Sequence, residues 1–327
     1  MQKRERVRAA LAGQPVDHVP MSFWGHDYLR EWSPRGLADA MLEPFFRYDW
    51  DYMKVNPRAT YYAEAWGARY KPSNDSTRGP ELIQRPLNSA ADLARVVRVS
   101  GVDGPFAEQL EALMLIRGEI GGADFIQTVF SPLSVLGYLA GRDLEMVRGW
   151  MKSDREAVHH ALSNLTETLS DYGRECLHAG ASGIFFATTD WATTDNLSRE
   201  LYAEFGRPYD LEVLSAVEMA EFNVLHVCRA HNMIEDMLDY PVRAFHWADR
   251  EPGNPSLVEL AGRVEQAVMG GVSQQTIAEG SIQEVEREVR EAVEAMGGRR
   301  VLIAPGCSIS PRTPPQNLEA AARARFL

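Results

Sequence analysis

The chain has 327 residues, of which 45% are hydrophobic and 24% charged, and its formal net charge at pH 7 is −12. These proportions are those of folded globular proteins, so a disordered chain is excluded, and the negative charge argues against a surface that binds nucleic acid. The length suffices for two average domains or for one large α/β barrel.

We expect neither a signal peptide nor a membrane span in this sequence. The basic start, residues 1–8, is followed by only a short apolar run, and we interpret it as the first turns of an amphipathic helix rather than a signal peptide. No run of about 18 uninterrupted apolar residues predicts a membrane span. The three cysteines are too few for a disulfide framework. We therefore expect a soluble cytoplasmic enzyme.

The first half of the chain predicts three strands separated by helices. The strand-like runs are residues 19–24, 52–56 and 125–130. The helical patterns cover residues 36–48, 106–120 and 144–179. Pro44 is expected to break or kink the first of these helices, and the third is expected to be two helices separated near Ser153. The pair Ser131-Pro132 predicts a turn after the third strand.

The second half alternates strand and helix more regularly. Strands are predicted over residues 183–188, 223–228, 244–248, 266–272 and 300–304. Helices are predicted over residues 198–222 with an interruption at Pro208, 233–238, 256–265 and 282–296. Repeated βα units imply a parallel sheet, and eight of them over this length predict a closed (β/α)8 barrel. A doubly wound open sheet is the rival, but no Gly-x-Gly-x-x-Gly follows a strand to support a dinucleotide site.

Residues 57–104 interrupt this alternation. They are rich in Pro, Gly, Asn and Arg, and we interpret them as an insertion after the second strand, with short strands of its own and a helix near residues 89–97. The predicted fold is therefore an α/β TIM barrel in a single domain over residues 1–327, with an N-terminal helical extension and this insertion.

Three soft metal-ligand residues stand at the ends of two predicted strands. His226 and Cys228 are two positions apart, so in an extended strand both side chains point the same way. Cys307 follows the last strand, and the carboxyl ends of barrel strands meet at one mouth. One imidazole and two thiolates suit zinc, and three protein ligands leave the fourth tetrahedral position open, as in catalytic sites.

Other polar or aromatic residues are predicted to surround the same mouth and to bind substrate. They are Trp24 and His26 after the first strand, Asn56 after the second, Ser131 after the third, Asp190 after the fourth, His246 on the sixth and Gln274 after the seventh.

Each of these residues also has a plainer interpretation. His246 lies on a buried strand, where a hydrogen-bonded core histidine is as good an explanation as a functional one. His26 and the aspartate after it could be a solvated pair, and Asp190 and Asp195 could be helix N-caps. Cys176 lies in a helical tract, so we expect it to be a small core residue.

Several motifs, spread over essentially the whole chain, resemble the uroporphyrinogen decarboxylase superfamily and occur in the order that the superfamily shows. They are a basic helix followed by Gln14-Pro15-Val16-Asp17-His18-Val19-Pro20, then Asp49-Trp50-Asp51-Tyr52-Met53-Lys54-Val55, Phe130-Ser131-Pro132-Leu133, Phe205-Gly206-Arg207-Pro208-Tyr209 and Gly306-Cys307. The resemblance supports the barrel. It implies one of two chemistries: metal-free decarboxylation of a tetrapyrrole, or methyl transfer between a corrinoid and a thiol at zinc.

The motifs are more similar to the zinc methyltransferase branch. The decarboxylases carry Arg-Gln-Ala-Gly-Arg-Tyr after the first strand, whose arginines bind substrate carboxylates. Here residues 23–30 read Phe-Trp-Gly-His-Asp-Tyr-Leu-Arg, and the paired arginines are missing. The methyltransferases carry His-x-Cys and a distant Cys as zinc ligands, matched here by His226, Cys228 and Cys307. The run Pro305-Gly306-Cys307 leading into Pro311-Arg312-Thr313-Pro314 is similar to that branch's C-terminal signature.

The resemblance thus implies a methyltransferase of the methylcobamide:coenzyme M type, with His226, Cys228 and Cys307 as metal ligands and catalytic residues. Its cofactors would be Zn²⁺ and a corrinoid such as methylcobalamin, supplied by a corrinoid-binding partner protein. The methyl acceptor would be a small thiol or a similar molecule, whose sulfur is deprotonated at zinc and attacks the methyl group on cobalt. A homodimer is compatible with the family, and neither nucleic acid nor a membrane is an expected partner.

Two other functions stay open at this point. A decarboxylase acting on a porphyrinogen or a smaller acid would need no zinc. A barrel that binds a corrinoid or thiol for delivery or sensing would hold its ligand without methyl transfer. The fourth zinc ligand of the resting state is also open, with water, Asp190, Asp195 and Asp249 as the alternatives.

Overall fold

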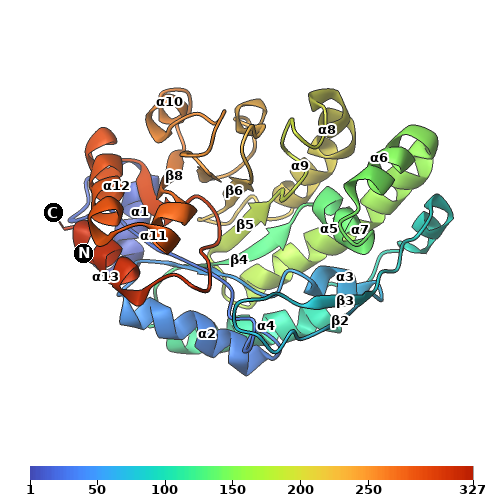
Figure 1. Cartoon of the computed structure of the whole chain (residues 1–327), viewed down its shortest axis with the longest axis horizontal. Coiled ribbons are helices and arrows are strands. Elements are labelled where there is room, and N and C mark those ends of the chain that lie inside the picture. Colours follow the sequence, from blue (N-terminus) through green and yellow to red (C-terminus); the bar gives the residue numbers. More distant parts are fainter. Residues whose placement is uncertain (327) are drawn as a thin grey trace.

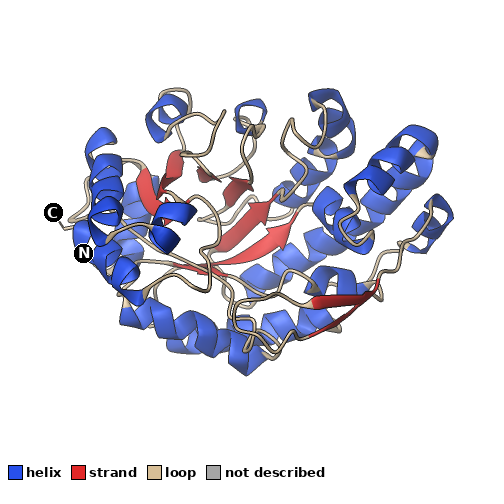
Figure 2. Ribbon diagram, viewed as in Figure 1, coloured by secondary structure: helices blue, strands red, loops and turns tan. Residues whose placement is uncertain are grey.

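A parallel sheet rolled up inside a ring of helices forms the centre of the molecule (Figures 1 and 2). The structure is a computed structural model that describes residues 1–326. Seven strands pair in the order β1-β4-β5-β6-β7-β8-β9, and every pair is parallel. Their bounds are β1 (Met53–Val55), β4 (Phe125–Phe130), β5 (Gly183–Ala187), β6 (Val224–Val227), β7 (Ala244–Trp247), β8 (Ala267–Val272) and β9 (Val301–Pro305). Each strand is buried along its whole length, as parallel strands covered on both faces are.

A short segment around Met21 holds the eighth position of the barrel. Met21 forms a parallel bridge with Ile303 of β9, and its carbonyl oxygen accepts a hydrogen bond of 2.9 Å from the backbone N–H of Asp51, just before β1. The segment therefore lies between the last and the first strand and closes the sheet. The strand predicted over residues 19–24 is reduced to this bridge because Pro20 has no N–H to donate to a ladder.

Helices cover the outside of the sheet (Figure 2). They are α1 (Lys3–Leu11), α2 (Pro34–Arg47), α3 (Tyr61–Ala65), α4 (Pro105–Glu119), α5 (Pro132–Leu139), α6 (Leu144–Ser153), α7 (Arg155–His178), α8 (Arg199–Phe205), α9 (Arg207–Ser215), α10 (Leu257–Ala261), α11 (Gln274–Glu279), α12 (Ile282–Ala295) and α13 (Pro315–Ala324), with 3₁₀ helices η1 (Ala90–Arg95) and η2 (Ile234–Asp236). The insertion after β1 contains the antiparallel pair β2 (Arg69–Lys71) and β3 (Glu81–Gln84). None of the helices within residues 1–326 is both long and apolar enough to cross a membrane.

The predicted α/β barrel is confirmed as the fold class, and several local predictions need correction. The interruption predicted at Pro208 lies at Gly206, and the helices predicted over residues 89–97 and 233–238 are the short 3₁₀ helices η1 and η2. Pro44 does not break its helix but lies inside α2, near the C-terminal end. Residues 132–139, where only a turn was predicted, form α5. The Ser131 hydroxyl accepts a hydrogen bond of 3.2 Å from the Ser134 N–H, and Pro132 occupies the first turn, where its missing N–H costs nothing.

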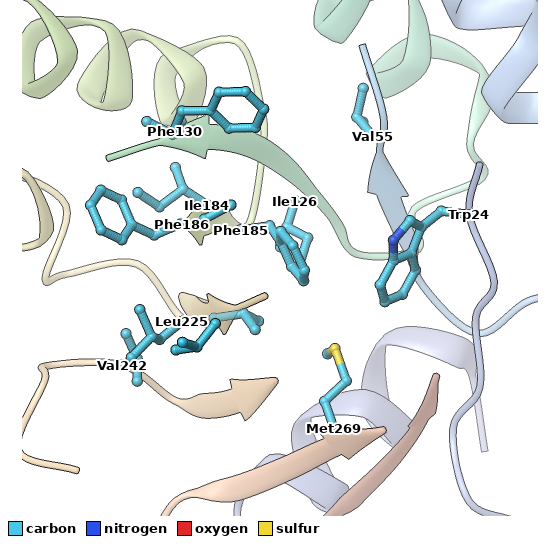
Figure 3. Packing of buried hydrophobic residues seen from close by; sticks show 14 of the residues in the cluster. Trp24, Val55, Ile126, Phe130, Ile184, Phe185, Phe186, Leu225, Val242 and Met269 are labelled. Atoms are coloured by element: carbon cyan, nitrogen blue, oxygen red, sulfur yellow. The ribbon is translucent and has the colours of Figure 1, made fainter. Parts of the chain in front are cut away.

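Large apolar side chains fill the inside of the barrel. Figure 3 shows Trp24, Phe185 and Met269 pointing into the space that the strands enclose. The rings of Trp24 and Phe185 meet edge to face, with centroids 5.5 Å apart. These side chains make the interior of the barrel a packed core.

A buried carboxylate ties both ends of the chain to the closure of the barrel. Asp51, 1% exposed, accepts hydrogen bonds from the Met21 N–H (2.9 Å), Arg6 (2.7 Å), Arg325 (3.2 Å) and His18 (3.2 Å). Burial by itself would raise the pKa of Asp51, but the hydrogen bond from His18 and the charge of Arg325 hold it below its ordinary value. The two termini lie close together on the same side of the molecule (Figure 1).

We predict that Asp51→Asn lowers the free energy of unfolding by about 3–5 kcal/mol, because it leaves two buried guanidinium groups without a full counter-charge. Urea unfolding at pH 7 measures the change. Because the folded-state pKa is depressed, the contribution of Asp51 is present above its unfolded-state pKa and is lost as pH falls through the folded-state pKa. The difference in the free energy of unfolding between the wild type and Asp51→Asn should therefore become smaller at acidic pH.

The matched control is Asp49→Asn. The Asp49 side chain is 70% exposed and pairs with Lys3 and Arg325, so its removal should cost only about 0–1 kcal/mol. If Asp51→Asn and Asp49→Asn lowered the free energy of unfolding equally at pH 7, this result would contradict a special role for the buried carboxylate of Asp51.

Candidate functional site

The structure brings His226, Cys228 and Cys307 together at the carboxyl ends of β6 and β9. The Nε2 atom of His226 lies 2.8 Å from the Cys228 sulfur and 3.8 Å from the Cys307 sulfur, and the two sulfurs are 3.8 Å apart. These three atoms all lie within 4.8 Å of one another. His226 is part of β6, Cys228 follows that strand directly, and Cys307 comes two residues after the end of β9, so the parallel closure of the sheet produces the cluster.

The donor set fits a zinc ion. With zinc–sulfur bonds of about 2.3 Å, a tetrahedral site separates its two sulfurs by about 3.8 Å, which is the separation of Cys228 and Cys307. The contact of 2.8 Å between Cys228 and His226 is a hydrogen-bond distance, and it shows that the Nε2 atom of His226 faces the sulfurs. Two thiols and one imidazole are the ligand types that zinc prefers.

His246, the hydrogen-bond partner of His226, determines which ring nitrogen of His226 is free to bind a metal. His246 lies behind His226, with Nε2 2.8 Å from the Pro305 carbonyl oxygen and Nδ1 2.6 Å from the Nδ1 of His226. A carbonyl only accepts, so Nε2 of His246 carries the proton and its Nδ1 accepts. Nδ1 of His226 is then the donor, and its Nε2 presents a lone pair to the two cysteines. Burial lowers the pKa of His246 well below its ordinary value, which keeps this ring neutral.

The two thiols are close enough to affect each other's ionisation. Their mutual hydrogen bond, together with burial, raises the pKa of Cys228, whereas the same contact lowers the pKa of Cys307. Cys176, by contrast, is buried in α7, and burial raises its pKa. It lies in the core, as the sequence predicted.

A cavity of about 570 Å³ opens at this end of the barrel, and the three candidate ligands line it. Among the predicted substrate-binding residues, those in its wall are Trp24, His26, Asn56, Asp190 and Gln274. Ser131 and His246 are not among the lining residues within the described part of the chain. The Ser131 hydroxyl caps α5, and His246 supports His226 from behind.

The carboxylates considered as a fourth ligand have other partners. Asp190 accepts hydrogen bonds from Arg142 and Arg229; burial would raise its pKa, but the charge of Arg142 and the hydrogen bond from Arg229 hold it below its ordinary value. Asp195 lies 3.1 Å from a ring nitrogen of His231. Asp249 accepts a hydrogen bond of 2.9 Å from the Gly271 N–H, away from the cavity wall.

Several residues of the cavity wall were missed by the sequence analysis: Lys54, Arg142, Arg229 and Glu251. Strand alternation places Lys54 on the same face as Asn56, and this signal could have found it. Arg142 and Arg229 lie outside the strands with φ angles of 62° and 75°, and no local pattern marked them. His26 has a partner that was also missed, because its Nδ1 lies 2.9 Å from the buried Glu31 carboxylate.

The chain matches the family model described as uroporphyrinogen decarboxylase (URO-D) over residues 2–325. It is 26% identical to a Methylcobamide:CoM methyltransferase, MtaA, of Methanosarcina barkeri, with 98% of this chain and 97% of the relative covered. It is 25% identical to a uroporphyrinogen decarboxylase of Thioalkalivibrio sulfidiphilus, with 66% of each chain covered.

A solved structure of a methyltransferase from Methanosarcina mazei has the same fold, with a TM-score of 0.86 at 23% identity over 99% of this chain and 98% of that one. A B12-independent methionine synthase from Shewanella has a more distant likeness, with a TM-score of 0.59 at 12% identity over 96% and 97% of the two chains. Because the family model spans nearly every residue, the chain belongs to the uroporphyrinogen decarboxylase (URO-D) family.

Proposed function

We propose that the chain is a zinc-dependent methyltransferase that moves a methyl group between a corrinoid, presented by a partner protein, and a small thiol. The observation that carries the proposal is the convergence of His226 Nε2 and the sulfurs of Cys228 and Cys307 on one point in the cavity wall. The relatives named Methylcobamide:CoM methyltransferase, which match over nearly their whole length, support it.

His226, Cys228 and Cys307 would hold the metal. Zinc bound there would lower the pKa of a thiol entering the fourth position and so supply a thiolate at neutral pH. The neutral His246 keeps the imidazole of His226 in the tautomer that binds through Nε2. Two thiolates and one neutral imidazole balance the charge of a divalent ion, so the incoming thiolate carries the net negative charge of the complex.

Methyl transfer would be a nucleophilic substitution at the methyl carbon, in which the thiolate would form the sulfur–carbon bond and the corrinoid would keep the electron pair of the broken cobalt–carbon bond. The thiol proton would leave beforehand. His26 lines the cavity and is oriented by the buried Glu31, so it is a suitable acceptor for this proton. A corrinoid is too large for a cavity of about 570 Å³, so a carrier would present it at the opening.

A metal-free decarboxylase is the second candidate, because other relatives carry that name. Three cationic groups line the cavity: Arg142 and Arg229, both engaged by Asp190, and Lys54, which could hold a substrate carboxylate. Zinc content distinguishes the two functions, since this decarboxylase chemistry has no use for the His-Cys-Cys cluster.

We predict about one zinc ion per chain in protein purified without chelators, and loss of that zinc in Cys307→Ser, because a hydroxyl is a poor zinc ligand. Elemental analysis measures the metal. The same variant should lose thiol-dependent demethylation of free methylcobalamin, followed by its absorbance. Cys176→Ala is the control and should keep the metal, since Cys176 is buried in α7 and is not among the residues that line the cavity. Methyl transfer by a metal-free variant would exclude the proposal.

We further predict that His246→Phe weakens zinc binding by about 10- to 100-fold, because the Nδ1–H of His226 loses its acceptor and the Pro305 carbonyl its donor. His246→Gln can accept through its side-chain oxygen and donate through its nitrogen, so it should recover most of the affinity. Competition with a chromophoric chelator measures both dissociation constants. Equal weakening in the two variants would show that ring packing, not hydrogen-bond direction, is what His246 provides.

A further inference from the structure

A second cavity, of about 240 Å³, lies beside the one that the candidate metal ligands line. Its wall consists of α2, the segment that follows the bridge at Met21, the chain between α2 and β1, and the loop that leads into α13. The two cavities share Trp24, His26 and Lys54, and no other described residue lines both. The second cavity is therefore a separate space, which the proposed function does not use.

Three side chains in the wall of the second cavity carry polar groups without a partner. Ser22, Trp50 and Tyr48 are 1%, 2% and 7% exposed, and their backbone N–H groups donate to carbonyl oxygens of the chain. The Ser22 hydroxyl, the Trp50 indole N–H and the Tyr48 hydroxyl form no hydrogen bond within residues 1–326. Polar groups buried to this extent nearly always have a partner. Because an indole N–H can only donate, a molecule that satisfies this wall must offer an acceptor.

Aromatic rings form much of the same wall. The ring of Trp50 lies 5.3 Å, centroid to centroid, from the ring of Phe23 and 5.3 Å from that of Tyr48. Met41 and Phe45 of α2 add apolar surface. Flat aromatic molecules pack well against such rings, in stacked or edge-to-face arrangements. The volume equals that of about eight water molecules, at about 30 Å³ each in the liquid, which suits a single substituted aromatic ring.

The charged groups that line only the second cavity are already paired. Arg30 donates to Asp27 at 2.7 Å and to Glu43 at 2.8 Å. Arg47 lies 3.7 Å from the Glu319 carboxylate. A charged ligand would lose its hydration here without gaining a free counter-charge, which is unfavourable. The wall therefore favours a neutral molecule.

Trp24, in the shared wall, connects the second cavity to the candidate metal ligands. Its ring centroid lies 5.3 Å from that of His246, and His246 accepts the hydrogen bond of 2.6 Å from His226. A molecule in the second cavity would touch one face of the residue that packs against the support of a metal ligand. Its presence would therefore bear on how firmly His246 holds His226.

We propose that the second cavity binds a small, neutral aromatic molecule with a hydrogen-bond acceptor, and that this molecule is an effector of the metal site. The donors of Ser22, Trp50 and Tyr48 take the acceptor, and the surrounding rings take the apolar part. The binding site stands on the second cavity alone, whereas the effect on the metal rests on the proposed function. Coupling of this kind is reciprocal, so zinc and the effector must change each other's affinity by the same factor.

The test of the site uses three flat probes of nearly the same size with the full chain. Acetophenone has a carbonyl acceptor, α-methylstyrene has a CH₂ group in place of that oxygen, and benzoate is charged. Titrations followed by ligand-observed NMR give the dissociation constants. We expect acetophenone to bind about 3- to 10-fold more tightly than α-methylstyrene, and benzoate to bind most weakly. Absence of acetophenone binding, equal affinity for acetophenone and α-methylstyrene, or preference for benzoate would overturn the inference.

Variants locate the binding. Trp50→Phe keeps a ring and removes the indole N–H, and Ser22→Ala removes the hydroxyl, so at least one of them should weaken acetophenone by about 3- to 10-fold and α-methylstyrene much less. Ala40→Leu fills the cavity from α2 and should abolish the binding of both. Trp66→Phe is the control, because this indole donates to the Val97 carbonyl outside the cavity. Unchanged acetophenone affinity in all variants would place the binding elsewhere and contradict the proposal.

A last measurement tests the effector role and separates it from the proposed function. Competition with a chromophoric chelator gives the zinc dissociation constant with and without saturating acetophenone. We expect a change of about 5-fold or more in the wild type and none in Ala40→Leu. Unchanged zinc affinity with acetophenone bound would reject the effector role. A chain that binds acetophenone as described but holds no zinc would reject the proposed function and leave the binding site standing.

Discussion

The candidate site depends on one constraint, the parallel closure of the sheet. All seven strands run the same way, so the carboxyl ends of β6 and β9 reach the same rim although β7 and β8 lie between them. This closure is completed by the bridge at Met21, which Asp51 holds through a buried network with Arg6 and Arg325. A loss of the closure at the far end of the barrel would therefore change the arrangement of the strand ends at the rim, where Cys307 must meet His226.

The direction of successive hydrogen bonds links the backbone at Pro305 to the candidate metal ligands. The carbonyl of Pro305 can only accept a hydrogen bond, so Nε2 of His246 carries the proton. The Nδ1 atom of His246 then accepts a hydrogen bond from Nδ1 of His226, and the lone pair on Nε2 of His226 faces the cysteines. Pro305 precedes Cys307 by two residues, so a single carbonyl both orients one ligand and lies beside another. Because the intermediate group is a neutral imidazole rather than a carboxylate, it orients His226 without adding negative charge to the centre.

The cavity wall carries charges of both signs. Near the opening, Asp190 engages both Arg142 and Arg229, and Asp195 and Glu251 line the same cavity. Lys54 has an aromatic environment and an amide beside it but no carboxylate partner among the described residues. The excess of acidic residues in the chain, whose net charge is −12, is therefore not repeated in the cavity lining.

The sequence by itself determined the fold class, most of the strands and the three candidate ligands. These follow from local rules: buried strands are continuous apolar runs, and a His-x-Cys pair in a strand shares one face. Other features were decided only by the tertiary structure. The partner of His226, the lone pair at its Nε2 atom and the burial of Lys54 without a carboxylate partner among the described residues are set by which strands the closed barrel brings together. No periodicity or spacing encodes such contacts, because they depend on which side chains a closed barrel brings face to face.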